Sequence, residues 1–192
     1  MSGRDTILQS IKINQPQLTA LPIIDIDAVI TYPDIVQQYK TVLESIGGQW
    51  EEFNNENEIA PWIEHEIKNK NRVINTLTTP ASDLIKLTAD DLEAVDVAIM
   101  QGTVAVAENG SIWLSETQMK NRLLPFICQQ LVIIVQTKNM VHTMHHAYKK
   151  INITETGFGV FIAGPSKTAD IEQSLVIGAH GPVGLKVLIV TG

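Results

Sequence analysis

The chain of 192 residues carries a formal net charge of -7 at pH 7, and 44% of its residues are hydrophobic. This length suits one domain with a substantial core, spanning residues 1–192, rather than two domains. Because only 5% of the residues are aromatic, the core must consist mainly of Ile, Val, Leu and Ala, which is typical of strands covered by helices on both faces. The Lys and Arg residues are scattered, whereas a nucleic-acid binder concentrates positive charge in one stripe. We therefore expect no nucleic-acid partner.

No stretch of the chain approaches the roughly 18 consecutive apolar residues of a membrane helix, and the N-terminal residues lack the apolar centre of a signal peptide. We therefore expect a cytoplasmic protein without a membrane span. The chain has one cysteine, Cys128, which excludes an internal disulfide and any cysteine-ligated zinc or iron-sulfur site made by this chain alone. Cys128 lies among apolar residues, which is more typical of a buried small side chain than of a nucleophile. We expect no cofactor in this chain.

Residues 1–30 are predicted to form an N-terminal arm. Ile7, Leu8 and Ile11 have helical spacing, and a stretch that contains Pro16 and Pro22 follows them. We expect this arm to lie on the domain or on a neighbouring molecule, so the pattern is compatible with a homo-oligomer.

The rest of the chain alternates between strand and helix patterns, which is typical of an α/β fold, here a three-layer sandwich with a mostly parallel central sheet. Pro33 and Asp34 suit the first turn of a helix, and Gly47-Gly48 suit its end. Asn109-Gly110, between two β-rich runs of the segment 95–115, predicts a hairpin turn and one antiparallel element. Strands are expected near 49–53, 72–77, 131–135, 160–163 and 185–191, and helices near 33–46, 56–69, 138–150 and 167–174, with a helix end near 122–126 broken at Pro125.

The segment 164–172, with the sequence GPSKTADIE, is the first candidate site. It is predicted to leave a buried strand through a Gly-Pro turn and to enter a helix, and the N–H groups at a helix start attract anions. Ser166, Lys167 and Thr168 would add two hydroxyl groups and one positive charge, a set that suits a carboxylate or a phosphate. In the alternative interpretation, Ser166 or Thr168 only caps the helix, and Asp170 favours its first turn.

Glu108 and His180 are the candidate catalytic residues. Glu108 stands beside the predicted hairpin turn, where a carboxylate tuned by burial could act as nucleophile or general base. Acids at hairpin tips also serve solubility alone. His180 lies in the loop 178–182, with the sequence GAHGP, in which Gly181 lets the backbone approach a ligand closely and the imidazole stays accessible for proton transfer. A loop histidine without a role is the alternative.

Three histidines, His142, His145 and His146, have the spacing of one helix face and could in principle bind a metal. Lys149 and Lys150 follow them, and no acid or cysteine lies nearby in the sequence. The pattern therefore favours a solvated helix face, and no metal site is predicted.

Together these segments resemble a known family. The runs 163–172 (AGPSKTADIE) and 178–182 (GAHGP) closely resemble the C-terminal signature of the LUD domain, which is found in LutC/YkgG-type lactate-utilisation proteins, and the hairpin 107–111 (AENGS) is similar to the family's acid-Thr-Gly-Thr/Ser element. By position, the resemblance implies a site made of Glu108, Gly164, Ser166, Lys167, Thr168, Asp170, His180 and Gly181. Asn109 stands where the family usually has Thr. Lys167 stands where it usually has Arg, so a single point charge replaces a planar two-pronged clamp.

The resemblance implies a fold like that of the ribose-phosphate isomerase and CoA-transferase superfamily. It also implies a role, with iron-sulfur partner subunits of the LutA and LutB type, in the oxidation of L-lactate to pyruvate. Two hypotheses follow. In the first, the chain is an accessory subunit that binds a small anionic metabolite or docks on the iron-sulfur subunits. In the second, it is a free-standing enzyme for an acyl or phosphorylated compound that uses Glu108. Since the chain has no redox motif, the sequence favours the first.

Overall fold

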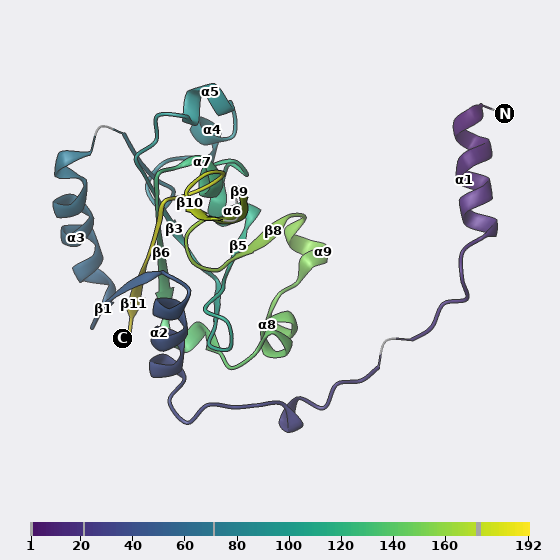
Figure 1. Cartoon of the computed structure of the whole chain (residues 1–192), viewed down its shortest axis with the longest axis horizontal. Coiled ribbons are helices and arrows are strands. Elements are labelled where there is room, and N and C mark those ends of the chain that lie inside the picture. Colours follow the sequence, from purple (N-terminus) through teal and green to yellow (C-terminus); the bar gives the residue numbers. More distant parts are fainter. Residues whose placement is uncertain (1, 21, 71, 172–173) are drawn as a thin grey trace.

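The computed structural model describes residues 2–20, 22–70, 72–171 and 174–192. Its centre is a sheet of five strands, in the order β1-β11-β6-β3-β2, in which every neighbouring pair is parallel (Figure 1). The predicted parallel central sheet is therefore confirmed. Its strands are β1 Gln49–Phe53, β2 Val73–Asn75, β3 Val97–Gln101, β6 Gln130–Gln136 and β11 Gly184–Val190.

Both faces of this sheet are apolar. In β6, Leu131 and Ile133 belong to the core on one face, and Val132 and Ile134 belong to the core on the other. Successive strand residues point to opposite faces, so a strand covered on both sides reads as an uninterrupted apolar run. Cys128, which is 1% exposed, packs in the first of these cores, as the sequence predicted.

One face of the sheet is covered by α3, Ile59–Glu66, which continues the short 3-10 turn η2, Glu56–Glu58, and leads into η3, Ile67–Asn69. The other face is covered by α2, Ile35–Ser45, together with a second sheet. Asp34 caps α2 by accepting the N–H of Gln37. Gly47 follows the C-terminal end of this helix. Its φ of +86° and the hydrogen bond from its N–H to the carbonyl of Glu44 are typical of a Schellman motif.

The second sheet has four strands in the order β7-β4-β5-β8. Its strands are β4 Val104–Val106, β5 Ile112–Ser115, β7 Met140–Val141 and β8 Gly159–Ile162. β4 and β5 form the antiparallel hairpin predicted around Asn109-Gly110. The outer face of this sheet packs on α8, Met144–Lys150, through Ala147. The remaining helices are α4 Ala81–Leu84, α5 Ala89–Leu92, α6 Glu116–Met119, α7 Leu124–Ile127, α9 Ile153–Thr156 and the 3-10 turns η1 Ile26–Ala28 and η4 Thr137–Asn139.

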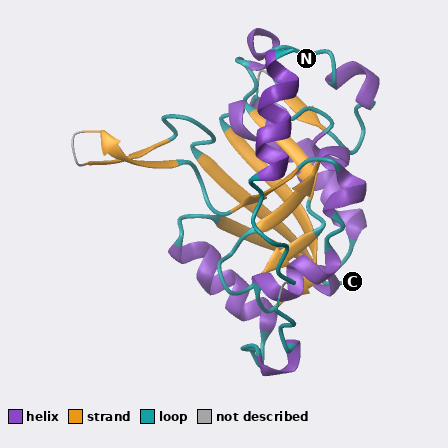
Figure 2. Ribbon diagram, turned by 90° about the vertical axis from the view of Figure 1, so that its right-hand side faces the viewer, coloured by secondary structure: helices purple, strands orange, loops and turns teal. Residues whose placement is uncertain are grey.

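Three sequence predictions of helices are wrong. The segment 167–174 forms β9, Lys167–Ile171, which pairs antiparallel with β10, Ser174–Ile177, in a hairpin that projects from the body (Figure 2). The segment 138–150 is helical only at its two ends, because Met140–Val141 pairs with β4. Pro125 lies in the first turn of α7 rather than at the end of a helix, a position where its missing N–H is tolerated.

The arm begins with α1, Gly3–Ile13, whose start is fixed by a capping box between Ser2 and Asp5. None of the residues of α1 is buried. Figure 1 shows α1 at the far end of an extended segment, away from the two sheets. Among the described residues, no helix has both the length and the apolar character needed to cross a membrane.

Candidate functional site

The two C-terminal signature loops, 164–166 and 178–182, pack directly on each other. The N–H of Ser166 donates to the carbonyl of Pro182 at 2.9 Å, and the N–H of Gly178 donates to the carbonyl of Ser166 at 3.0 Å. A Cβ placed on Gly181 would lie 3.0 Å from the Cβ of Ser166. A side chain at position 181 would require Ser166 to move by a few tenths of an ångström, and the two hydrogen bonds make the two loops one unit.

This unit forms one side of a pocket of 210 Å³, called the loop pocket below. Gly164, Ser166, His180 and Gly181 all line it, so the structure brings these four sequence-predicted residues together. An apolar wall faces them, made by Pro125, Phe126, Leu131, Phe161 and Leu185. The volume lies below the range of about 300–1,000 Å³ that is usual for larger organic ligands, so the loop pocket suits a small metabolite.

The loop pocket lies at the amino ends of the central strands, because Leu131 and Leu185 are the second residues of β6 and β11. The sequence instead predicted a ligand beyond the carboxyl end of a strand, at the start of a helix. The predicted helix start is wrong, whereas the turn does follow the carboxyl end of a strand. The Gly164 turn follows β8, which belongs to the second sheet, and it leads into the strand β9 rather than a helix. Helix N–H groups therefore do not supply an anion site at this turn.

Two other predicted site residues, Lys167 and Thr168, do not line the loop pocket. A Cβ placed on Gly47 would lie 3.5 Å from the ammonium nitrogen of Lys167, so this cation lies at the C-terminal end of α2, where the helix dipole favours it. Thr168 stands opposite Val176 in the β9–β10 ladder. Asp170 belongs to β9, and its side chain lies outside the described residues.

Glu108 has a structural contact at the β4–β5 turn. Its carboxylate accepts the N–H of Met144, the first residue of α8, at 2.9 Å, and its own N–H donates to the carbonyl of His142. The side chain is exposed and does not line the loop pocket. The side-chain oxygen of Asn109 accepts hydrogen bonds from both the N–H and the hydroxyl of Ser111. Asn109, which stands where the family usually has Thr, thus stabilises the turn with its own side chain.

Gly110 of the β4–β5 turn and Gly164 of the C-terminal signature both lie close to Ile46, which follows the end of α2. A Cβ on Gly110, which has a φ of +69°, would lie 2.9 Å from Cδ1 of Ile46. A Cβ on Gly164, which has a φ of +73°, would lie 2.7 Å from the carbonyl oxygen of Ile46. Both glycines thus allow their turns to approach α2 closely, and part of the signature has an architectural role.

The histidines do not share one helix face, because His142 precedes α8. Nδ1 of His142 accepts the N–H of Tyr32, and Nδ1 of His146 lies 2.9 Å from the hydroxyl of Thr143. Partial burial, together with the charge of the neighbouring His142, lowers the pKa of His146. Among the described residues, no group of three or more His, Cys, Asp or Glu side chains is placed to hold a metal.

The sequence analysis missed a second pocket, of 240 Å³, at the carboxyl ends of β2 and β3. Asn75 and Gln101, the last residues of these strands, line it together with Thr78. Most of the remaining wall is apolar and comes from Ile59, Ala60, Ile63, Leu77 and Ile134. Among the residues that the structure describes, no Lys or Arg lines this pocket, which makes it a poor site for an anion. A polar residue at the end of each apolar strand pattern is the signal that could have revealed it.

Comparison with known proteins places the chain in a family. It matches the family model described as the LUD domain over residues 27–190. It is 32% identical over 104 residues to lactate utilization protein C of Oceanobacillus iheyensis. The alignment covers 51% of this chain and 45% of that protein. It is 33% identical over 116 residues to lactate utilization protein C of Geobacillus thermodenitrificans, which covers 57% and 48%. The match thus spans about half the length of these curated relatives.

A solved structure has the same fold. The crystal structure of a DUF162 family protein from Deinococcus radiodurans superposes with a TM-score of 0.61 at 20% identity and covers 81% of this chain and 96% of that one. The family match over most of the chain leads to one conclusion: the protein belongs to the LUD domain family.

Proposed function

We propose that this protein is a cytoplasmic accessory subunit of an L-lactate utilisation system, in which it binds a small anionic metabolite at the loop pocket. Its membership of the LUD family and its similarity to proteins named lactate utilization protein C support the lactate role. The observation that carries the assignment to this pocket is the convergence of both C-terminal signature loops on one cavity.

The chemistry of the loop pocket fits a short carboxylic acid such as L-lactate or pyruvate. The hydroxyl of Ser166 can donate a hydrogen bond to a carboxylate, and His180, when protonated, adds a positive charge. Phe126 and Phe161 provide an apolar surface for a methyl group. Hydrogen bonds to a charged group are the stronger kind, so the carboxylate should dominate recognition.

In this proposal the electrons released by lactate oxidation pass to iron-sulfur subunits of the LutA and LutB type. The chain contributes only Cys128 as a thiol, and burial raises the pKa of that thiol to about 12. Glu108 lies outside the loop pocket and holds the start of α8, which favours the accessory role over an enzyme that uses Glu108 as its nucleophile.

The test is a thermal-unfolding titration of the purified chain with L-lactate and pyruvate, with the neutral amide lactamide as the matched control ligand. A ligand at about 100 times its dissociation constant adds about 2.7 kcal/mol, which for a chain of this length raises the melting temperature by about 5–10 °C. We expect this rise with the acids and not with lactamide.

The variants decide where the acid binds. Ser166→Ala and His180→Ala should abolish the rise in melting temperature. Lys167→Ala, which removes a nearby cation that does not line the loop pocket, should retain it. A rise that persists in both loop variants, or that only Lys167→Ala abolishes, would refute the assignment to this pocket.

A further inference from the structure

Eight of the sixteen exposed large hydrophobic residues of the described chain lie in the N-terminal arm. Leu18 and Ile23 are 98% and 99% exposed, and Ile7, Leu8 and Ile11 of α1 are each more than half exposed. Scattered single apolar residues are common on protein surfaces, but a contiguous apolar group marks an interaction site. We therefore expect the apolar residues of the arm to pack against another protein surface.

α1 has the pattern of a helix that docks in a groove. Ile7, Leu8 and Ile11 form an aliphatic stripe on one side, and Arg4 and Lys12, each four residues from Leu8, flank it. An isolated helix of this length is marginally stable in water, so the capping box at Ser2 alone does not hold it. Helix-in-groove recognition supplies the missing stabilisation by burying such a stripe.

The arm meets the body near Tyr32 and again around Pro22 and Ile23, and α1 lies beyond both places. The N–H of Tyr32 donates to Nδ1 of His142 at 3.1 Å. Further out, Pro22 and Ile23 line a shallow hollow with Tyr148 of α8. The segment 14–21 between this hollow and α1 can extend over about 25 Å. α1 can therefore reach a neighbouring molecule while its own base stays fixed.

The second pocket, at the carboxyl ends of β2 and β3, has a lining that complements the aliphatic stripe of α1. It runs beside α3, and its wall is mainly apolar, with Ile59, Ile63, Leu77 and Ile134. Of the four Glu residues in the segment 56–66, Glu56 lines this pocket, and among the described residues no Lys or Arg does. A mainly apolar wall with the carboxylate of Glu56 at its edge matches an aliphatic stripe flanked by cations.

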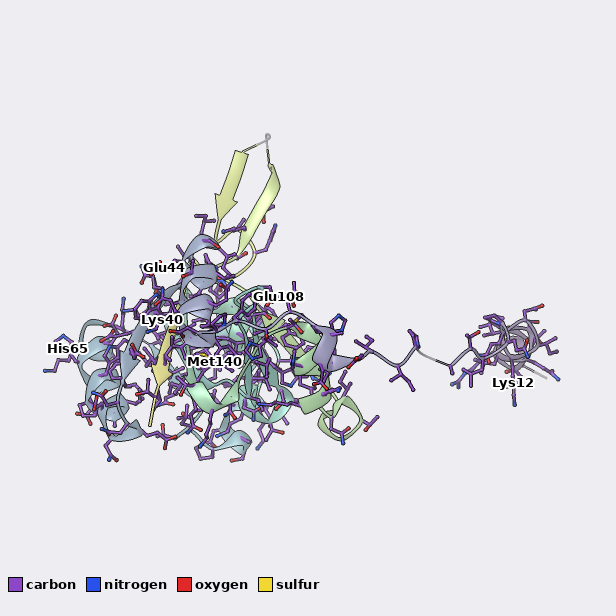
Figure 3. All side chains as sticks on the ribbon, turned by 90° about the horizontal axis from the view of Figure 1, so that it is seen from below. Lys12, Lys40, Glu44, His65, Glu108 and Met140 are labelled. Atoms are coloured by element: carbon purple, nitrogen blue, oxygen red, sulfur yellow. The ribbon has the colours of Figure 1, made fainter. Side chains whose placement is uncertain are left out.

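Within one chain these two features lie far apart. Figures 1 and 3 place α1, with Lys12, and α3, with His65, at opposite ends of the molecule along its longest axis. A second copy offers both features again, and a two-fold axis would let each arm occupy the other copy's groove. We propose that two chains associate by reciprocal docking of α1 in the groove beside α3 of the partner copy, an interaction that does not depend on the proposed function.

The test measures the mass of the full-length chain by analytical ultracentrifugation between about 1 and 100 µM, where micromolar association is visible. We expect a monomer–dimer equilibrium. Leu8→Glu in the arm and Leu77→Glu in the groove should each weaken dimerisation at least tenfold. Ile85→Glu, a change at a more exposed aliphatic residue outside both features, should leave it unchanged. Because α1 has no buried residue, Leu8→Glu should fold normally.

Mixing the two defective variants gives the sharpest readout. The Leu77→Glu chain keeps an intact arm, and the Leu8→Glu chain keeps an intact groove, so the mixture should form a heterodimer although each variant alone stays monomeric. A monomeric wild-type chain over the whole concentration range would overturn the proposal. Dimers that all three variants form equally well would overturn it too. A monomer in which Leu8 resists hydrogen exchange would mean that the arm docks on its own body, which also contradicts the proposal.

Discussion

Replacing Gly164 by alanine tests whether the LUD signature stabilises the fold as well as lining the loop pocket. Gly164 has a φ of +73°, and this left-handed conformation costs a residue with a side chain about 1–2 kcal/mol. The added Cβ would also lie 2.7 Å from the carbonyl oxygen of Ile46. Because backbone rather than a side-chain tip makes this contact, the turn or the end of α2 must shift, which adds about 1–3 kcal/mol.

We therefore expect Gly164→Ala to lower the free energy of unfolding by about 2–5 kcal/mol, which corresponds to a fall in melting temperature of about 5–15 °C. Urea unfolding followed by circular dichroism measures this loss directly. Gly3→Ala is the matched control, because a Cβ at Gly3 meets no atom within 4 Å. A Gly164→Ala chain as stable as the wild type would refute the packing argument and leave the glycine with a ligand role alone.

Three further predictions concern side chains outside the loop pocket. Glu108→Ala removes the acceptor of the Met144 N–H and should lower the free energy of unfolding by about 1 kcal/mol. Glu108→Gln keeps an acceptor oxygen and should lose less, so equal losses would contradict the capping role. Partial burial and the charge of His142 lower the pKa of His146 below its ordinary value near 6.5, so the unfolded chain binds more protons and stability should fall as the pH drops through about 6.5. His146→Gln should flatten this dependence in urea titrations between about pH 7.5 and 5.5, and an unchanged pH profile would contradict the assignment. Burial raises the pKa of the Cys128 thiol to about 12, so a thiol reagent should modify Cys128 only after unfolding, and fast labelling of the native chain would show that the site is accessible.

The central sheet could be predicted from the sequence because its strands are buried on both faces. A run such as Leu131–Val135 has no polar interruption, and a strand between two apolar layers requires that pattern. Asn109-Gly110 likewise marked its hairpin, since local turn geometry alone decides it. The sequence could not show that β3 and β4, separated by Gly102 and Thr103, belong to different sheets, because only non-local pairing partners settle that.

The strands β9 and β10 show why the helix near 167–174 was mispredicted. Ser166, Thr168 and Asp170 satisfy the local pattern of a helix start, and the same residues also fit a strand. The choice is made by pairing with residues 174–177, which no local pattern reports. Because a helix start was predicted here, Lys167 was expected to face an anion at that start. In the structure its ammonium group lies beside Gly47. The convergence of Ser166, His180 and Gly181 was easier to anticipate, because their two loops belong to one signature.

The placement of the two pockets at opposite edges of the central sheet has a consequence for regulation. β6 has seven residues, which sets about 20 Å between the amino and carboxyl edges. The five residues of β6 between its two ends are all buried and close-packed, so this strand offers no second arrangement through which one edge could influence the other. Acid binding at the loop pocket and arm docking beside α3 should therefore be uncoupled. In a titration, the affinity for the acid would then be the same in the monomer and in the dimer.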